Sequence, residues 1–382
     1  MFWGLINFLQ YKAPVSIKDS MLNPFLQLLI FTLCSIDFAE AVGAKFKLSS
    51  WPAADSLFHQ DPRFRGGDGA YSIDLGQGRI LWLMGDSFIA SRDNLRRNNS
   101  TMIRNCVAVQ DGLNPAKAKI RFTWRYDGTT PASFFKESGM NWFWPGHGTM
   151  IGDRLLIFLM KIGPTNSVLG FHSVGWNAVL VENPAEIPRL WNMRLLHGLP
   201  NSWNILVGSA SVFLNGDYLY AYSAEDTGPR GAYLVRFSRD EAYLGDLSKP
   251  HWWDPDRQQW KLQSEIMDKP ISLFENAPTE FTIHFSPTMR KWIQFQINGF
   301  GGAPIISRSA SNMTGPWKKG DLEFYPQEAT TQGVLIYAAK AHPALEGSVN
   351  LVLTYASNLL DFKKLLEEER FYYPRFLKLQ WD

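Results

Sequence analysis

Cysteine is nearly absent from this chain of 382 residues. The two cysteines are Cys34 and Cys106, and Cys34 falls in an apolar N-terminal stretch, so we expect no disulfide in the folded domain. A chain of this length can bury a core that is stable without disulfides. The missing disulfide therefore neither supports nor opposes secretion.

Charge is also scarce, because charged residues make up 19% of the chain and the formal net charge is +2. No long run of one sign occurs, so the chain lacks the basic field that nucleic-acid binding requires. Histidine and cysteine show no tight metal-ligand spacing, so we expect no catalytic zinc and no cofactor. The chain also lacks a phosphate-binding glycine loop, the Gly-x-Ser-x-Gly motif and the Ser-x-Asp-x-Gly-x-x-Trp boxes of sialidases.

The N-terminus has the pattern of an export signal. Lys12 and Lys18 precede an apolar stretch, Met21 to Ile36, and an Ala-x-Ala site ends at Ala41. We therefore expect a leader at residues 1–41 and an exported protein, periplasmic or secreted, with an uncleaved N-terminal anchor as the alternative. The leader is unusually long, so a true start at Met21 is a second alternative. No later stretch reaches the roughly 20 apolar residues that a spanning helix needs, so we expect no membrane span in the mature chain.

Aromatic residues, by contrast, are abundant: they form 14% of the chain and include 15 tryptophans. Such residues fill cores, and they also stack on sugar rings where they are exposed. After residue 50, short runs of β-forming residues are separated by Gly, Asn, Asp and Pro, which is typical of an all-β fold.

One hairpin unit recurs along the chain, with a polar or small entry, a strand, a tight turn and a very apolar strand. Its five copies are Asp68–Asp86, Pro145–Met160, Gly208–Tyr222, Glu280–Gln296 and Ile336–Tyr355. Further strand-like runs follow the hairpins, so the units fit five blades of four strands. We predict a single five-bladed β-propeller over residues 50–382, with a pair of β-sandwiches as the alternative.

The first strand of each propeller blade lines the central axis. The entry residues of the five hairpins should therefore converge there, and they are Asp68, His147, Ser209, Glu280 and His342.

Asp68 and Asp86 are the strongest catalytic candidates. Both lie nine positions from Gln77, the centre of the first hairpin's turn, so they should face each other at its open end. Facing like charges destabilise a sheet, which favours a functional pair over two turn caps. Paired carboxylates are the catalytic groups of glycosidases, about 5–5.5 Å apart in retaining enzymes and roughly 6.5–9.5 Å apart in inverting ones. Repulsion should raise one pKa, and we expect Asp68 as nucleophile or base and Asp86 as acid.

Other residues are candidates for the same site. Glu280 is a third catalytic carboxylate candidate. The candidates for substrate contact are His147, His342, Trp142, Trp144, Glu225 and Asn358. Structural histidines, inter-blade tryptophans and a solvated loop around Glu225 are the alternatives. The arginines that flank the aspartates, which we expect to be solvated loop charges, are Arg63, Arg65, Arg96 and Arg97.

Several motifs together resemble a known bacterial family. They are Gly66-Gly-Asp-Gly69, Leu83-Met-Gly-Asp-Ser-Phe88, Ala339-Lys-Ala-His-Pro343, Leu353-Thr-Tyr-Ala-Ser-Asn358 and Tyr373-Pro-Arg-Phe376. The family was long known only as a domain of unknown function, and its members or relatives include endo-D-arabinanases. Wider relatives are five-bladed propeller furanosidases that act on arabinan and xylan decorations. The resemblance covers most of residues 55–380 and implies that Asp68 and Asp86 are the catalytic carboxylates.

We therefore expect an exported, monomeric glycoside hydrolase that cleaves furanosidic linkages in an arabinan- or arabinogalactan-type polysaccharide. A non-catalytic carbohydrate-binding propeller is the alternative from another class. An exo-acting furanosidase or transglycosidase on the same fold is the enzymatic alternative.

Overall fold

The computed structural model describes residues 46–136, 139–166, 170–226, 228, 230–346 and 351–381. The predicted leader lies outside these residues. Within them, no helix is both long enough and apolar enough to cross a bilayer.

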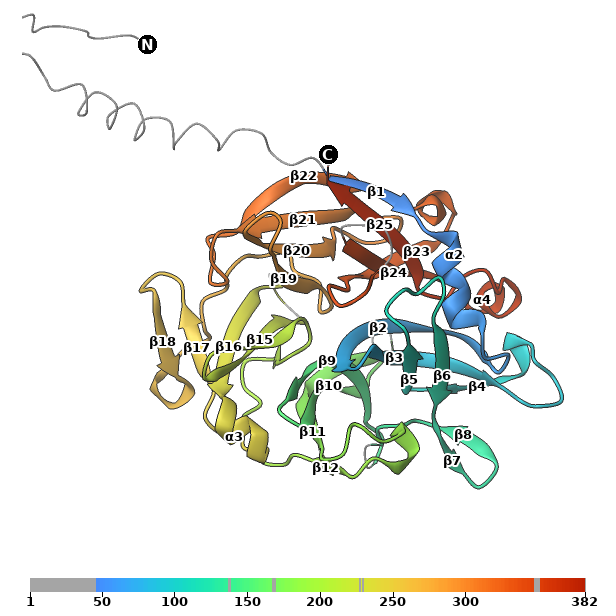
Figure 1. Ribbon diagram of the computed structural model, residues 1–382, viewed down its shortest axis with the longest axis horizontal. Helices are drawn as coiled ribbons and strands as arrows, with labels where there is room; N and C mark the ends of the chain where they lie inside the picture. The colour runs from blue at the N-terminus through green and yellow to red at the C-terminus, as the bar shows by residue number, and fades with distance from the viewer. Residues whose placement is uncertain are drawn as a thin grey trace, which may run out of the picture. The chain divides into compact units, whose positions relative to one another are not determined.

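Five antiparallel sheets surround a common axis, which confirms the predicted five-bladed β-propeller (Figure 1). The innermost strands contact one another around the axis and are β2 (Phe64–Gly76), β9 (Trp142–Ile151), β14 (Val212–Asn215), β19 (Thr282–Ser286) and β23 (Val334–Ala341). The second strands are β3 (Arg79–Ala90), β10 (Arg154–Pro164), β15 (Tyr218–Glu225), β20 (Lys291–Ile297) and β24 (Leu351–Leu359). Each pair is one of the hairpins predicted from the sequence.

The outer strands complete the blades. The third strands are β5 (Cys106–Asp111), β11 (Phe171–Val181), β16 (Ala232–Ser238), β21 (Ile305–Ala310) and β25 (Arg375–Trp381). The fourth strands are β6 (Lys119–Thr123), β12 (Met193–Leu195), β17 (His251–Asp254), β22 (Lys318–Phe324) and β1 (Phe46–Ser50). Short additional strands are β4 (Ser100–Ile103), β7 (Arg125–Asp127), β8 (Thr130–Ala132), β13 (Ile205–Leu206) and β18 (Gln259–Leu262).

The second strands are continuous apolar runs because both of their faces are covered by neighbouring blades. In β3, Ile80 and Trp82 belong to the cluster shared with blade five, whereas Leu81 and Leu83 belong to the cluster shared with blade two. Similar clusters fill the other three blade interfaces. Successive side chains of one strand therefore pack into two different blade interfaces. Both faces of the strand are apolar for this reason, and the sequence shows a run of hydrophobic residues and no period of two.

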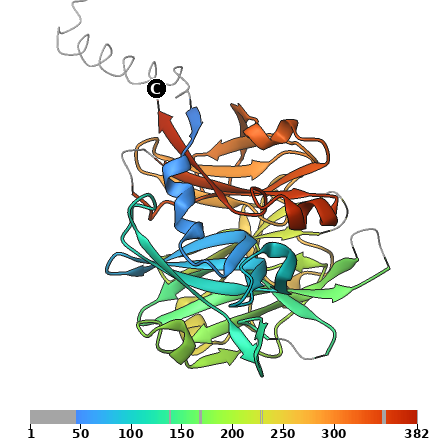
Figure 2. The same cartoon turned by 90° about the vertical axis from the view of Figure 1, so that its right-hand side faces the viewer.

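Blade five is closed by the two ends of the domain, a feature that the sequence analysis did not identify. Its outermost strand is β1, which pairs antiparallel with β25. The short helix α2 (Pro52–Asp55) follows β1 and lies against β25, beside the first blade (Figure 2). Asp55 accepts a hydrogen bond from the Phe376 amide and forms an ion pair with Arg375, so it fixes this junction.

Histidines occupy the polar centre of the propeller. His147 Nδ1 accepts a hydrogen bond from the Val212 amide at 2.8 Å, and its Nε2 lies 3.2 Å from the Ser72 carbonyl oxygen. His342 Nδ1 lies 2.7 Å from Ser72 Oγ, and its Nε2 lies 2.7 Å from Thr354 Oγ1. Burial lowers the pKa of His147 to about 4 and holds the pKa of His342 well below its usual value, so both rings are neutral at physiological pH.

This burial predicts that His147 makes the fold sensitive to acid. Because its folded pKa of about 4 lies below the unfolded value of 6.5, the unfolded chain gains the proton first as the pH falls. The resulting loss of stability should begin near pH 6.5, reach about 2 kcal/mol at pH 5 and level off below pH 4. We expect the His147→Gln variant to be less stable than the wild type at pH 7.5. Between pH 7.5 and pH 5, its free energy of unfolding should fall by about 2 kcal/mol less than that of the wild type. Urea denaturation at the two pH values measures this difference, and a stability gap that is independent of pH would contradict it.

Candidate active site

Asp68 and Asp86 lie next to each other at one end of the propeller axis. The register pairs Gly67 with Ser87 and Gly69 with Met84, so Asp68 faces the Gly85–Asp86 step. The Asp68 carboxylate passes directly over Gly85, where a Cβ atom would overlap its Oδ1. The glycine before Asp86 is therefore required by the close approach of the two strands.

Asp68 is surrounded by neutral donors and other carboxylates. Its Oδ2 accepts hydrogen bonds from the hydroxyls of Tyr337 at 2.8 Å and Tyr372 at 3.1 Å. Burial raises the pKa of Asp68, and the charges of Asp86 and Glu280 raise it further, to about 7, although the two tyrosines oppose this shift. Asp68 can therefore hold a proton close to neutral pH.

Asp86 has a cationic partner instead. Arg104 donates to Asp86 Oδ2 at 3.1 Å, and the indole Nε1 of Trp144 donates to Oδ1 at 2.8 Å. Burial raises the pKa of Asp86, but Arg104 and Trp144 both act against this by favouring the charged form. The Asp86 side chain keeps 14% of its surface exposed, so solvent reaches it. The two aspartates thus differ in their surroundings even though they are neighbours.

Glu280 joins this group through a buried lysine. The Lys340 ammonium donates to Glu280 Oε1 at 2.7 Å and to the Gly69 carbonyl at 2.6 Å, and it lies 4.2 Å from the centre of the Tyr71 ring. The Lys340 side chain has no exposed surface, whereas the Glu280 side chain is 20% exposed. Lys340 therefore balances the charge of Glu280 and ties blades one, four and five together beside Asp68.

Two β-bulges aim these side chains at the axis. In β23 the register shifts between Tyr337 and Lys340, so these two residues, three positions apart, both reach the site instead of facing opposite ways. Ala338, inside that bulge, has φ +54°, and Ala70, inside the matching bulge of β2, has φ +59°. Tyr372 also has a positive φ of +67°. Left-handed backbone at residues other than glycine is costly and is concentrated at functional sites.

Arg97 positions the segment that carries Tyr372, and this corrects the expectation that Arg97 is a solvated loop charge. The Arg97 residue is completely buried, and its guanidinium donates to the carbonyl oxygens of Arg65, Leu365 and Phe371, at 2.8, 2.7 and 2.6 Å. The Phe371 carbonyl immediately precedes Tyr372. The arginine therefore satisfies backbone acceptors that would otherwise be buried without donors.

The remaining candidates fall into two groups, those that surround the aspartates and those that have a structural role elsewhere. Trp144 and Asn358 belong to the first group. Trp144 bonds to Asp86, as described above, and Asn358 forms a side-chain hydrogen bond with Tyr337. Trp142 lies beside Trp144, with ring centres 6.2 Å apart, and the Arg104 guanidinium lies 4.2 Å from the centre of the Trp142 ring. Both tryptophans pack partly buried against a small apolar cluster, so neither is a free platform for a sugar ring.

The other group is placed for structure. Glu225 is buried, accepts a hydrogen bond from the Gly231 amide at 3.0 Å and forms an ion pair with Lys269 at 2.7 Å, so it organises its own loop. The rings of His147 and His342 are held inside the propeller by the contacts given above. These contacts explain all three residues without a substrate.

Four residues of the site were missed in the sequence, namely Tyr337, Tyr372, Arg104 and Lys340. Lys340 carried a usable signal, because a lysine inside an inner strand must find a partner when it is buried. Arg104 lies in the short link between β4 and β5, and Tyr372 lies outside the hairpins, so periodicity could not place either one. Among the described residues, no group of three or more His, Cys, Asp or Glu side chains is arranged to hold a metal ion.

The fold and this group of acids define a five-bladed propeller with a carboxylate cluster at one end of its axis. Sequence comparison gives the family: residues 53–381 match the one described as "Domain of unknown function (DUF5005)", and the chain belongs to it. No curated protein matches the sequence.

Solved structures share the fold at low sequence identity. A protein from Bacteroides ovatus, described as a "putative hydrolase", is 16% identical with a TM-score of 0.68, over 90% of this chain and 93% of that one. The catalytic domain of the Coprinopsis cinerea GH62 α-L-arabinofuranosidase is 10% identical with a TM-score of 0.49, over 89% and 98% of the two chains. The endo-arabinase of Bacteroides thetaiotaomicron is 14% identical with a TM-score of 0.44, over 81% and 92%. At these identities, the likeness to the Bacteroides ovatus structure supports the fold alone.

The Lys340–Glu280 pair predicts a distinctive pattern of stability changes. Lys340→Met leaves the Glu280 carboxylate unpaired beside Asp68, and removing one partner of a buried pair costs about 3–5 kcal/mol. The double variant Lys340→Met/Glu280→Gln removes the unpaired charge as well, so it should recover at least half of that loss. Urea denaturation of the two single variants and the double variant measures this coupling, and additive losses would contradict it.

Proposed function

We propose that this protein is a glycoside hydrolase in which Asp68 is the general acid and Asp86 is the base or nucleophile. The observation that carries the proposal is the contrast between two neighbouring carboxyl groups. Asp68 lies among carboxylates and tyrosine hydroxyls and holds a proton to about pH 7, whereas Asp86 bonds to the guanidinium of Arg104. Pairs of titratable groups whose surroundings separate their pKa values are typical of acid–base assignments. The roles are the reverse of those expected from the sequence.

The chemistry follows from these surroundings. Asp68 donates its proton to the glycosidic oxygen, so the leaving sugar departs as a neutral alcohol while positive charge develops on the anomeric carbon and ring oxygen. Asp86, whose charged form Arg104 favours, either attacks that carbon or takes a proton from the water that does so. If Asp86 attacks, water then breaks the bond between Asp86 and the sugar and gives a proton to Asp68, which restores both groups. If Asp86 activates the water, Asp86 releases the proton it has taken to solvent and Asp68 regains one from solvent. Glu280 contributes by raising the proton affinity of Asp68. Lys340 contributes by fixing the adjacent backbone at Gly69.

The substrate class rests on the resemblance of the aspartate motifs to those of endo-D-arabinanases and their furanosidase relatives. We therefore propose a furanose-containing polysaccharide of the arabinan or arabinogalactan type as the substrate. Export through the predicted leader and action as a monomer belong to the same proposal. A non-catalytic carbohydrate-binding propeller is the rival, but binding alone gives no reason to hold two carboxyl groups against each other in a partly buried place.

Removing either carboxyl group should abolish hydrolysis. We expect Asp68→Asn and Asp86→Asn each to lower kcat by about 10²–10⁴-fold on the active polysaccharide, because proton transfer or nucleophilic help is lost. Asp74→Asn is the matched control, since Asp74 lies on the same hairpin, is exposed and bonds only to the turn amide of Gly76. The measurement is product analysis after incubation with arabinogalactan, L-arabinan and arabinoxylan. Unchanged activity in both Asn variants would refute the mechanism.

The pH profile tells which aspartate gives the proton. If Asp68 is the acid, kcat/KM should fall as the pH rises through about 7, where Asp68 loses its proton. Tyr337→Phe removes a hydrogen bond that favours the charged form of Asp68, so the basic limb should move to higher pH. Tyr325→Phe is the control, because Tyr325 is 57% exposed and bonds to Glu323. If Asp68 were the base, activity would instead fall as the pH drops through the same midpoint.

A further inference from the structure

A cavity lies at the end of the propeller axis opposite to the aspartates. Strand β2 starts near Asp68 and then runs along the axis to Ser72, which lines the cavity. The cavity has a volume of about 500 Å³ and is formed by the inner strands of blades three and four together with residues 341–344 of blade five. This volume lies within the range of small-molecule sites.

Three aromatic rings form one wall of the cavity. Phe285 and Trp292 meet edge to face, with ring centres 5.7 Å apart, and Phe213 lies 5.1 Å from Trp292. Phe285 leaves 45% of its surface exposed. The wall therefore offers an exposed aromatic surface that faces a half-open space.

The rest of the lining is polar but uncharged. Hydroxyl, amide and imidazole groups come from Ser72, Ser211, Asn215, His147 and His284, and no lining residue is Asp, Glu, Lys or Arg. His284 Nδ1 is buried and has no hydrogen-bond partner among the described residues. Burial lowers the pKa of both histidines to about 4, so the whole lining is neutral at physiological pH.

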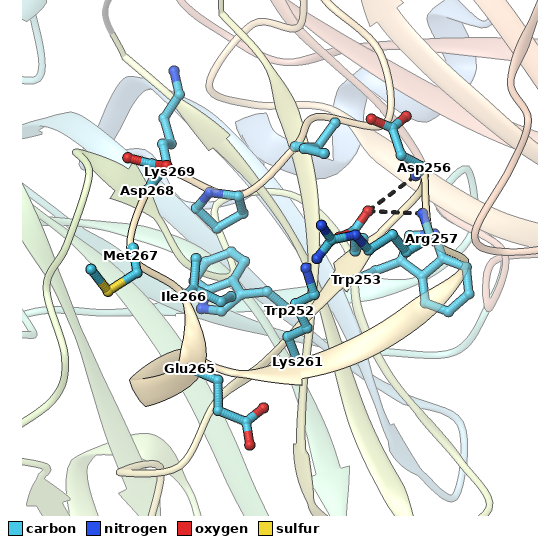
Figure 3. Close-up of a pocket in the computed structure, with 13 residues that line it drawn as sticks. Trp252, Trp253, Asp256, Arg257, Lys261, Glu265, Ile266, Met267, Asp268 and Lys269 are labelled. Atoms are coloured by element: carbon cyan, nitrogen blue, oxygen red, sulfur yellow. Dashed lines mark hydrogen bonds and ion pairs between the residues drawn. The ribbon is translucent and has the colours of Figure 1, made fainter.

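A second cavity, at the outer edge of blade three, differs from this one because its lining is charged. A cavity of about 430 Å³ lies there between the β17–β18 hairpin and the segment up to Ile271 (Figure 3). Its lining includes Asp254, whose carboxylate pairs with Lys261 at 2.7 Å and accepts hydrogen bonds from the amides of Asp256 and Arg257. The buried indole Nε1 of Trp253 in this lining also has no hydrogen-bond partner among the described residues, but the lining is charged, which sets this cavity apart from the axial one.

We infer that the axial cavity is a second sugar-binding site, which takes one or two uncharged pyranose or furanose rings. A sugar presents an apolar C–H face, which fits the aromatic wall, and hydroxyls that can bond to the serines, Asn215 and His284. The absence of charge in the lining disfavours uronic acids, phosphates and amines, because an unpaired charge would have to leave water. This site is separate from the aspartates and does not rest on the proposed hydrolysis.

The test measures binding at the axial cavity without turnover. Xylobiose, cellobiose and L-arabinobiose are titrated into the Asp86→Asn protein by calorimetry, and then into the same protein carrying Phe285→Ala. We expect at least one disaccharide to bind, and Phe285→Ala to weaken that binding about tenfold or more. Phe300→Ala is the matched control, because Phe300 is 73% exposed and does not line the cavity. His284→Phe, which removes a polar partner and keeps a ring, should weaken binding as well.

Three results would overturn the inference. They are the failure of all three disaccharides to bind, equal binding to the proteins with and without Phe285→Ala, and Phe285-dependent binding of the apolar dye ANS alone. Circular dichroism melting of each variant verifies that it is folded. Sugar binding by the Asp86→Asn protein that depends on Phe285 would stand even if no hydrolysis were found.

Discussion

The crowding of three carboxylates at one end of the axis is the constraint on which the rest of the site depends. Asp68, Asp86 and Glu280 come from blades one and four, and their mutual repulsion in a partly buried place must be compensated. Lys340 and Arg104 supply positive charge, and tyrosine hydroxyls supply hydrogen bonds. Since these partners come from several blades, the carboxylates can be held together only when the ring is complete.

Three of the ten described non-glycine residues with positive φ, namely Ala70, Ala338 and Tyr372, are located where this compensation is needed. The bulges at Ala70 and Ala338 let residues three positions apart reach the same cluster, which a regular strand would forbid. The buried guanidinium of Arg97 holds the segment that delivers Tyr372. Rigid packing around strained positions fixes the carboxyl groups before any ligand arrives, and such preorganisation is the main source of electrostatic catalysis.

The sequence allowed the fold and the Asp68–Asp86 pair to be predicted because both depend on local patterns. Hairpins are encoded by turns and apolar runs, and equal spacing around one turn places two residues opposite each other. Tyr337 and Lys340 were not predicted because a bulge changes the direction in which their side chains point. The amino-acid composition of a strand gives little indication of a bulge. The proposed proton assignment differs from the one expected from the sequence because the charges on which it rests, those of Arg104 and Glu280, come from outside the hairpin. The structural role of His342 depends on burial, which periodicity does not reveal.

The pairing of β1 with β25 has a consequence for how the chain reaches its native state. The two strands are separated by almost the whole described sequence, so blade five lacks its outer strand until both ends of the domain are present. Contacts of such long sequence separation slow folding, and the edges of β1 and β24, which both pair with β25, stay unpaired meanwhile. A nascent chain would therefore hold four formed blades and an open ring until β25 has been synthesised. The hydrogen bonds from Tyr337 and Tyr372 of blade five to Asp68 of blade one therefore form only at this last step.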